Sequence, residues 1–168
     1  GLAAGTLAAG RSRAADAPAV GAGEIMLRRS LPVKHDVDVF IAGGGPAGTA
    51  AAVAARSQGA SVYLAEAHTC FGGMGTAGRV PVFMQVSDGV NFLAGGYGRR
   101  VLDRLAKEKV LTGPSTDIEA LKRVYDALVV ESGATFSFYT TLSGVEARGG
   151  QIRYVVCSSP GGLFAVKA

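Results

Sequence analysis

Residues 36–66 read DVDVFIAGGGPAGTAAAVAARSQGASVYLAE, and this stretch decides the expected fold. Residues 36–42 are short, β-branched and apolar, which is typical of a strand buried on both faces of a parallel sheet. Residues 46–57 are predicted to form a helix, because a proline begins the segment and a glycine follows it. Residues 61–65 are predicted to form a second strand. The order of strand, glycine-rich loop, helix and strand predicts a βαβ unit in an α/β fold.

The loop after the first strand, GGGPAG, fits the pattern G-x-G-x-x-G. The pattern alone is weak in a chain with 25 glycines, but here it follows a strand and opens a helix. We expect Gly43 to make the sharp turn, Gly45 to leave room for a pyrophosphate, and Gly48 to let the helix approach the strand. Backbone N–H groups at the helix start, around Pro46 and Ala47, would hold the phosphate charge. The alternative is an ordinary turn into a helix.

An acidic residue, Glu66, ends the second predicted strand, 23 residues after Gly43. A carboxylate at this distance can accept hydrogen bonds from both ribose hydroxyls of an adenosine, and it would repel a 2′-phosphate. The spacing therefore predicts a dinucleotide site that includes Glu66 and the adjacent Ala67, and it disfavours NADP. The alternative is a solvated acid at the end of a strand.

The rest of the chain alternates between irregular and periodic segments. TDIE at residues 116–119 is a capping-box signature, and it opens a predicted helix that ends before Gly133. An amphipathic helix is predicted over residues 97–109. The predicted later strands, of which the last three form a β-meander, are residues 135–139, 142–147, 152–158 and 163–168.

Residues 36–67, together with CFGGMGTAG at residues 70–78, resemble the N-terminal half of FAD-dependent oxidoreductases with two dinucleotide-binding domains. The closest group is the one often named simply FAD-dependent oxidoreductase, and the resemblance covers residues 36–168. In that family the second glycine-rich loop lies along the cofactor, near the pyrophosphate and the flavin. The resemblance implies cofactor contacts in this loop, made by Gly72, Gly73, Met74 and Thr76. A flexible surface loop is the alternative.

The resemblance implies a Rossmann-like FAD-binding domain with a parallel sheet, crossover helices and a β-meander, truncated at its C-terminus. It further implies hydride transfer between an organic substrate and FAD, with a small-molecule substrate and a separate electron acceptor as partners. The alternatives are an NAD-linked dehydrogenase and a non-catalytic dinucleotide-binding module. No catalytic residue can be assigned, and we expect the isolated chain to be inactive.

Neither of the two cysteines indicates thiol or metal chemistry. Cys70 lacks the nearby second cysteine that disulfide reductases of similar fold carry, and Cys157 lies in a predicted strand, where a small core residue is expected. Neither cysteine has metal-ligand spacing with a histidine, so we expect no metal site.

Charge and hydropathy narrow the expected partners. Five basic and two acidic residues precede Asp36, so most of the net charge of +4 belongs to the N-terminal segment. No basic stripe with interleaved aromatic residues is present, which disfavours nucleic acid. The sequence contains no run of about 18 apolar residues, so no membrane span is predicted.

The composition divides the chain into three parts. Residues 1–17 are rich in alanine and glycine and read as part of an export signal or as a disordered tail. Residues 18–35 read as a linker, and residues 36–168 as the incomplete FAD-binding domain. An export signal of such weak hydrophobicity favours the twin-arginine route and a periplasmic or exported protein; otherwise the protein is cytoplasmic.

Overall fold

A computed structural model describes residues 21–168 of the chain. The chain divides into two units between residues 30 and 31. The predicted export signal at residues 1–17 lies outside the described residues. Everything that follows concerns the second unit. None of the helices within the described range is long and apolar enough to cross a membrane.

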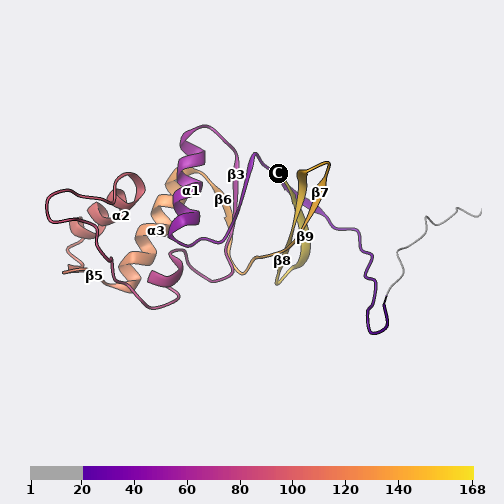
Figure 1. Cartoon of the computed structure of the whole chain (residues 1–168), viewed down its shortest axis with the longest axis horizontal. Coiled ribbons are helices and arrows are strands. Elements are labelled where there is room, and N and C mark those ends of the chain that lie inside the picture. Colours follow the sequence, from indigo (N-terminus) through magenta and orange to yellow (C-terminus); the bar gives the residue numbers. More distant parts are fainter. Residues whose placement is uncertain (1–20) are drawn as a thin grey trace, which may run out of the picture. The chain divides into compact units, whose positions relative to one another are not determined.

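A parallel three-stranded sheet carries the predicted βαβ unit (Figure 1). Strands β2 (Val39–Ala42), β3 (Val62–Ala65) and β6 (Thr135–Ser137) pair in the order β2-β3-β6. Helix α1 (Pro46–Ser57) connects β2 to β3 and has the predicted bounds. The α/β fold and the parallel sheet are therefore confirmed.

A second sheet contains the predicted meander. Its order is β1-β9-β8-β7, with antiparallel pairing between the last three strands along the chain. The strands are β1 (Val33–Asp36), β7 (Thr141–Arg148), β8 (Gln151–Ser159) and β9 (Gly162–Lys167).

The single strand predicted over residues 36–42 is wrong, because the chain changes sheets within it. Asp36 ends β1, which pairs in parallel with β9, and β2 begins only at Val39 in the other sheet. Between them, the Asp38 side chain accepts hydrogen bonds from both the N–H and the hydroxyl of Ser61, each at 2.7 Å. β2 is also less buried than expected, because it lies at the edge of its sheet.

A long connection joins β3 to β6 and contains two helices and a small hairpin. Helix α3 (Ile118–Ser132) is capped by Asp117 and not by Thr116, the first residue of the predicted capping box. Thr116 pairs within the hairpin, and the Asp117 Oδ1 atom accepts the N–H of Ala120 at 2.7 Å. The elements are η1 (Gly73–Gly75), α2 (Gly96–Lys107), β4 (Leu111–Thr112), β5 (Ser115–Thr116) and α3 (Ile118–Ser132).

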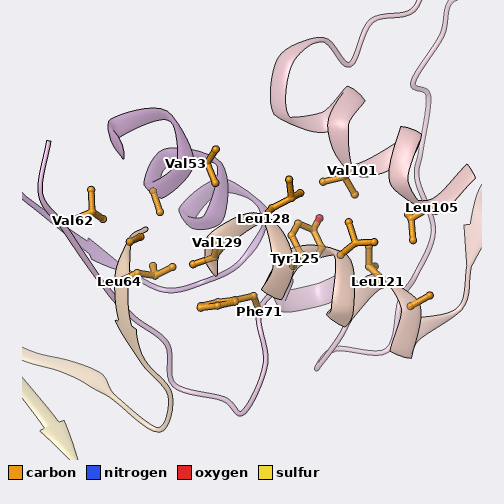
Figure 2. Close-up of a cluster of buried hydrophobic side chains, with 14 residues drawn as sticks. Val53, Val62, Leu64, Phe71, Val101, Leu105, Leu121, Tyr125, Leu128 and Val129 are labelled. Carbon is orange, nitrogen blue, oxygen red and sulfur yellow. The ribbon is translucent and has the colours of Figure 1, made fainter. Parts of the chain in front are cut away.

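Strand β3 lies between two hydrophobic clusters, since its side chains alternate between the faces of the sheet. Val62 and Leu64 pack into the cluster formed with the three α-helices, of which Figure 2 shows the main side chains. Tyr63 and Ala65 pack toward the meander with residues that include Cys157, which is fully buried as predicted. The sheet that carries the glycine loop is therefore packed on both faces.

Helix α1 packs closely against the glycine-rich loop at Gly48. A Cβ atom on Gly48 would lie 1.8 Å from the Gly43 carbonyl oxygen, whereas a Cβ on Gly45 would have no heavy atom within 4 Å. We expect Gly48→Ala to lower the free energy of unfolding by about 3 kcal/mol through overpacking. The control Gly45→Ala should change it by about 1 kcal/mol or less, because alanine is a poorer N-cap than glycine. Chemical denaturation measures both, and equal stabilities would contradict the close packing.

Candidate nucleotide-binding site

The first glycine-rich loop leads from the end of β2 into an open helix start. Gly43 has a φ of +96°, a conformation that favours glycine, and its N–H donates to the Ala65 carbonyl at 2.7 Å. Gly45 is the N-cap of α1, and no side chain caps this end of the helix. The first turn also lacks an acidic residue. The partial positive charge and the N–H groups of the helix start are thus left for a ligand.

The Glu66 carboxylate fixes this loop by accepting a backbone hydrogen bond from it. Its Oε2 atom accepts the N–H of Gly44 at 2.6 Å, and its Oε1 atom accepts the N–H of His68 at 2.7 Å. The residue is only 4% exposed. A carboxylate has about four acceptor positions, so two remain beyond these backbone contacts. Glu66 is therefore aimed at the glycine loop and not at bulk solvent.

The backbone of Glu66 is fixed as firmly as its side chain. Its N–H donates to the Ser137 carbonyl at 2.9 Å, and its carbonyl accepts the N–H of Thr140 at 2.8 Å. Both partners belong to the segment that ends β6 and follows it. Glu66 therefore ties together the carboxyl ends of three parallel strands.

The second glycine-rich loop docks directly on the first. The Gly72 N–H donates to the Gly44 carbonyl at 2.9 Å, and a Cβ on Gly73 would lie 3.1 Å from the Gly45 Cα atom. Gly72 and Gly73 both have positive φ, +103° and +53°. Met74 is 66% exposed beside them. The two loops expected to contact the cofactor are therefore brought together at the start of α1.

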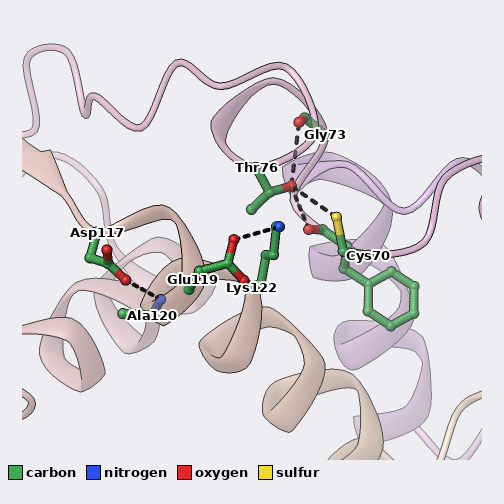
Figure 3. A network of polar contacts seen from close by, with 8 residues as sticks. Cys70, Gly73, Thr76, Asp117, Glu119, Ala120 and Lys122 are labelled. Carbon is green, nitrogen blue, oxygen red and sulfur yellow. Dashed lines mark hydrogen bonds and ion pairs between the residues drawn. The ribbon is translucent and has the colours of Figure 1, made fainter.

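Thr76 has a different environment from its neighbours in this loop. It is 1% exposed, and its hydroxyl donates to the Phe71 carbonyl at 2.6 Å, with Cys70 Sγ 3.8 Å away (Figure 3). Its N–H donates to the Gly73 carbonyl. These bonds hold the loop in shape from inside and turn the Thr76 side chain inward.

Helix α3 packs against the second loop. A Cβ on Gly72 would lie 2.7 Å from the Tyr125 ring, and burial raises the pKa of Tyr125 to about 12. Burial also raises the pKa of the neighbouring Asp126, and the backbone N–H of Phe71 offsets part of that shift. Tyr125 is therefore neutral at physiological pH and serves as packing for the loop.

Two residues that the sequence analysis did not single out are central to this geometry. Gly44 occupies a free position of the motif, yet a Cβ there would lie 2.4 Å from the Phe71 ring. Phe71 is fully buried and packs edge-on against Phe136, with ring centroids 5.1 Å apart. The signal for Phe71 is an aromatic residue directly before a Gly-Gly pair in an otherwise irregular segment.

These features define a nucleotide-binding βαβ unit of the Rossmann type, with a glycine loop, a helix start and a strand-end carboxylate converging at one edge of the sheet. The sequence model of the family described as FAD dependent oxidoreductase matches residues 38–168. The chain belongs to this family. FAD is accordingly the cofactor. No curated protein matches the chain.

Solved structures show the same fold at low sequence identity. The myxobacterial chondrochloren halogenase CndH, described as a variant of FAD-dependent halogenases, has a TM-score of 0.55 and 15% identity, and the match covers 80% of this chain and 36% of that one. A flavoprotein/dehydrogenase from Cytophaga hutchinsonii has a TM-score of 0.54, 13% identity, and coverage of 80% and 38%. THI4 from Thermovibrio ammonificans has a TM-score of 0.51, 19% identity, and coverage of 79% and 55%. The chain therefore spans between about a third and about half of the length of these structures.

Removing the Glu66 carboxylate should loosen the loop. We expect Glu66→Ala to lower the free energy of unfolding by about 3 kcal/mol, because two N–H groups lose a charged acceptor. Glu66→Gln should lose roughly half as much, since one side-chain oxygen remains. Denaturation and amide hydrogen exchange at Gly44 and His68 measure the effect.

The matched control is Glu146→Ala on the exposed face of β7, which should change the stability by about 0.5 kcal/mol or less. A Glu66→Ala variant as stable as this control, with unchanged exchange at Gly44, would show that the carboxylate does not hold the loop.

Proposed function

We propose that this chain carries the ADP-binding part of the FAD site of an oxidoreductase. The observation that carries the proposal is the open start of α1, where Gly45 faces free space while the adjacent Gly44 is fixed on both sides. The pyrophosphate would be held by the backbone around Gly43, Gly45 and Gly48. Pro46 and Ala47 are both exposed at this start, as a binding surface requires.

Glu66 has two tasks in this proposal. It fixes the loop through its contact with Gly44, and its remaining acceptor positions would receive the ribose hydroxyls. Ala67 is exposed directly after it and would border the adenosine. Because Glu66 is only 4% exposed, ribose contact would require the residues that cover the carboxylate to move aside.

The second loop would extend the site toward the flavin. Gly73 lies against Gly45, so the backbones of the two loops are adjacent. Gly72, Gly73 and the exposed Met74 would contact the cofactor there. Thr76 would act indirectly, by holding the loop in shape.

When bound, FAD supplies reversible two-electron chemistry. We propose that the whole protein uses it to oxidise a small organic substrate by hydride transfer and to pass the electrons to a second acceptor. The residues of this chain contribute binding, orientation and exclusion of water. The similar solved structures are named as a halogenase and as a flavoprotein/dehydrogenase, so the fold alone does not select the reaction.

Gly45→Val tests the position of the pyrophosphate. The valine side chain meets no protein atom within 4 Å of its Cβ, and the φ of −66° at Gly45 suits any residue, so the fold should be retained. The side chain would fill the space that the pyrophosphate needs. We expect FAD affinity to fall roughly 100-fold or more, which corresponds to about 2.7 kcal/mol. Quenching of FAD fluorescence on binding measures the affinity.

The control for this experiment is Ala54→Val, on an exposed position of the same helix, which should bind FAD like the unmodified chain. Circular dichroism verifies that both variants are folded. A folded Gly45→Val variant with unchanged FAD affinity would remove the loop from the site.

A further inference from the structure

Tyr139 has a strained backbone conformation directly after strand β6. Its φ is +51°, in the left-handed region, which is rare for a bulky residue. Its N–H donates to the His68 carbonyl at 3.2 Å, and the N–H of Thr140 donates to the Glu66 carbonyl at 2.8 Å. In a regular strand successive N–H groups point to opposite edges, so both reach the same segment only because the backbone turns at Tyr139. The strained residue is thus part of the contact that fixes Glu66.

The Tyr139 side chain lies outside the core, unlike the two aromatic side chains before it. Phe136 and Phe138 both pack on Phe71, with ring centroids 5.1 and 4.8 Å away. Tyr139 is 58% exposed. A glycine would adopt its φ without strain. Neither core packing nor the backbone angle therefore explains why a tyrosine occupies this position.

The order of the strands brings Tyr139 into line with the proposed ADP site. Strand β2 leads into the start of α1, β3 leads into Glu66, and β6 leads into Tyr139. The three strands are parallel neighbours in the order β2-β3-β6 (Figure 1), so their carboxyl ends follow one another at about 4.8 Å per strand. Pyrophosphate, ribose and adenine follow one another along ADP in the same way. With the pyrophosphate at α1 and the ribose near Glu66, the adenine reaches the end of β6.

The surroundings of Tyr139 suit an uncharged and planar group. Residues 133–145 contain no charged side chain. Ala67 and Tyr139 are both exposed on segments that the bond to the His68 carbonyl holds together. The phosphates have their N–H groups at the helix start instead. A purine is flat and uncharged, and a base that stacks on an aromatic side chain gains affinity.

We propose that the Tyr139 ring stacks on the adenine of the cofactor and gives the site its preference for a purine nucleotide. The inference rests on the proposed function, because the adenine reaches Tyr139 only if ADP lies across the ends of β2 and β3. The left-handed conformation keeps the ring out of the core and available to the base. Tyr139 binds the base and takes no part in electron transfer.

Two substitutions of Tyr139 test the proposal on the 168-residue chain. Tyr139→Gly relieves the strain and should leave the chain folded, which thermal denaturation verifies. Its affinity for ADP, measured by calorimetric titration, should fall about tenfold. Tyr139→Phe keeps the ring and should bind ADP within about a factor of two of the unmodified chain. A folded Tyr139→Gly variant with unchanged affinity, or an equal loss in both variants, would overturn the proposal.

UDP separates stacking from a structural role of Tyr139. It has the same ribose and pyrophosphate as ADP but a smaller base, which stacks less. Tyr139→Gly should therefore weaken UDP binding by a smaller factor than ADP binding. Equal factors for the two nucleotides would indicate a disturbed backbone around Glu66 and would overturn the proposal.

The matched control is Lys109→Gly. Lys109 also has a left-handed conformation, with a φ of +59°, and it is exposed just after the end of α2. This substitution relieves the same kind of strain away from the site and should leave ADP affinity unchanged. A loss of affinity equal to that of Tyr139→Gly would assign the effect to the backbone and contradict stacking.

Gly45→Val separates this inference from the proposed function. If Gly45→Val weakens ADP binding and Tyr139→Gly does not, the pyrophosphate site stands and the stacking proposal alone fails. If ADP does not bind the unmodified chain, or binds the Gly45→Val variant equally well, the proposed function fails and the inference fails with it.

Discussion

The hydrogen bond from the Gly44 N–H to the Glu66 carboxylate is the constraint on which the rest of the site depends. A buried carboxylate is costly unless its oxygens are paired, and here two backbone N–H groups pair with them. The same Gly44 peptide accepts the Gly72 N–H on its other side. Neither loop can therefore shift without uncovering a buried charge or an unpaired carbonyl. The binding surface is preorganised, which reduces the ordering that a ligand must otherwise bring about.

The glycines of the first loop have different physical roles, although the sequence motif does not distinguish them. Gly43 is required for its backbone angle, Gly48 for its contact with the Gly43 carbonyl, and Gly44 for its contact with Phe71. Only Gly45 combines an ordinary φ with empty space beside it. A glycine that neither the backbone angle nor the protein packing requires leaves room for a ligand to approach the backbone. Gly45 is therefore the position of this loop that leaves room beside its backbone.

Local sequence signals predicted the elements that local interactions determine. Helix α1 was predicted to the residue, because its proline start and glycine end act within one or two turns. The break between β1 and β2 could not be predicted, since it depends on pairing with β9, more than 120 residues later. The α3 cap was misassigned because Thr116 and Asp117 are both good caps, and only the β4–β5 pairing chooses between them. The inward bond from Thr76 to Phe71 was not predicted for a similar reason, because it depends on how the loop folds.

The arrangement around α1 separates two kinds of chemistry. On one side of the helix start, backbone N–H groups and a carboxylate form a polar surface at the carboxyl ends of β2 and β3, where ligands bind in open α/β sheets. On the other side, alanine, proline and tyrosine side chains enclose an apolar space. A dinucleotide satisfies the first surface through its phosphates and ribose but gains nothing from the second. The start of α1 therefore lies between a polar surface that suits phosphates and an apolar one that does not.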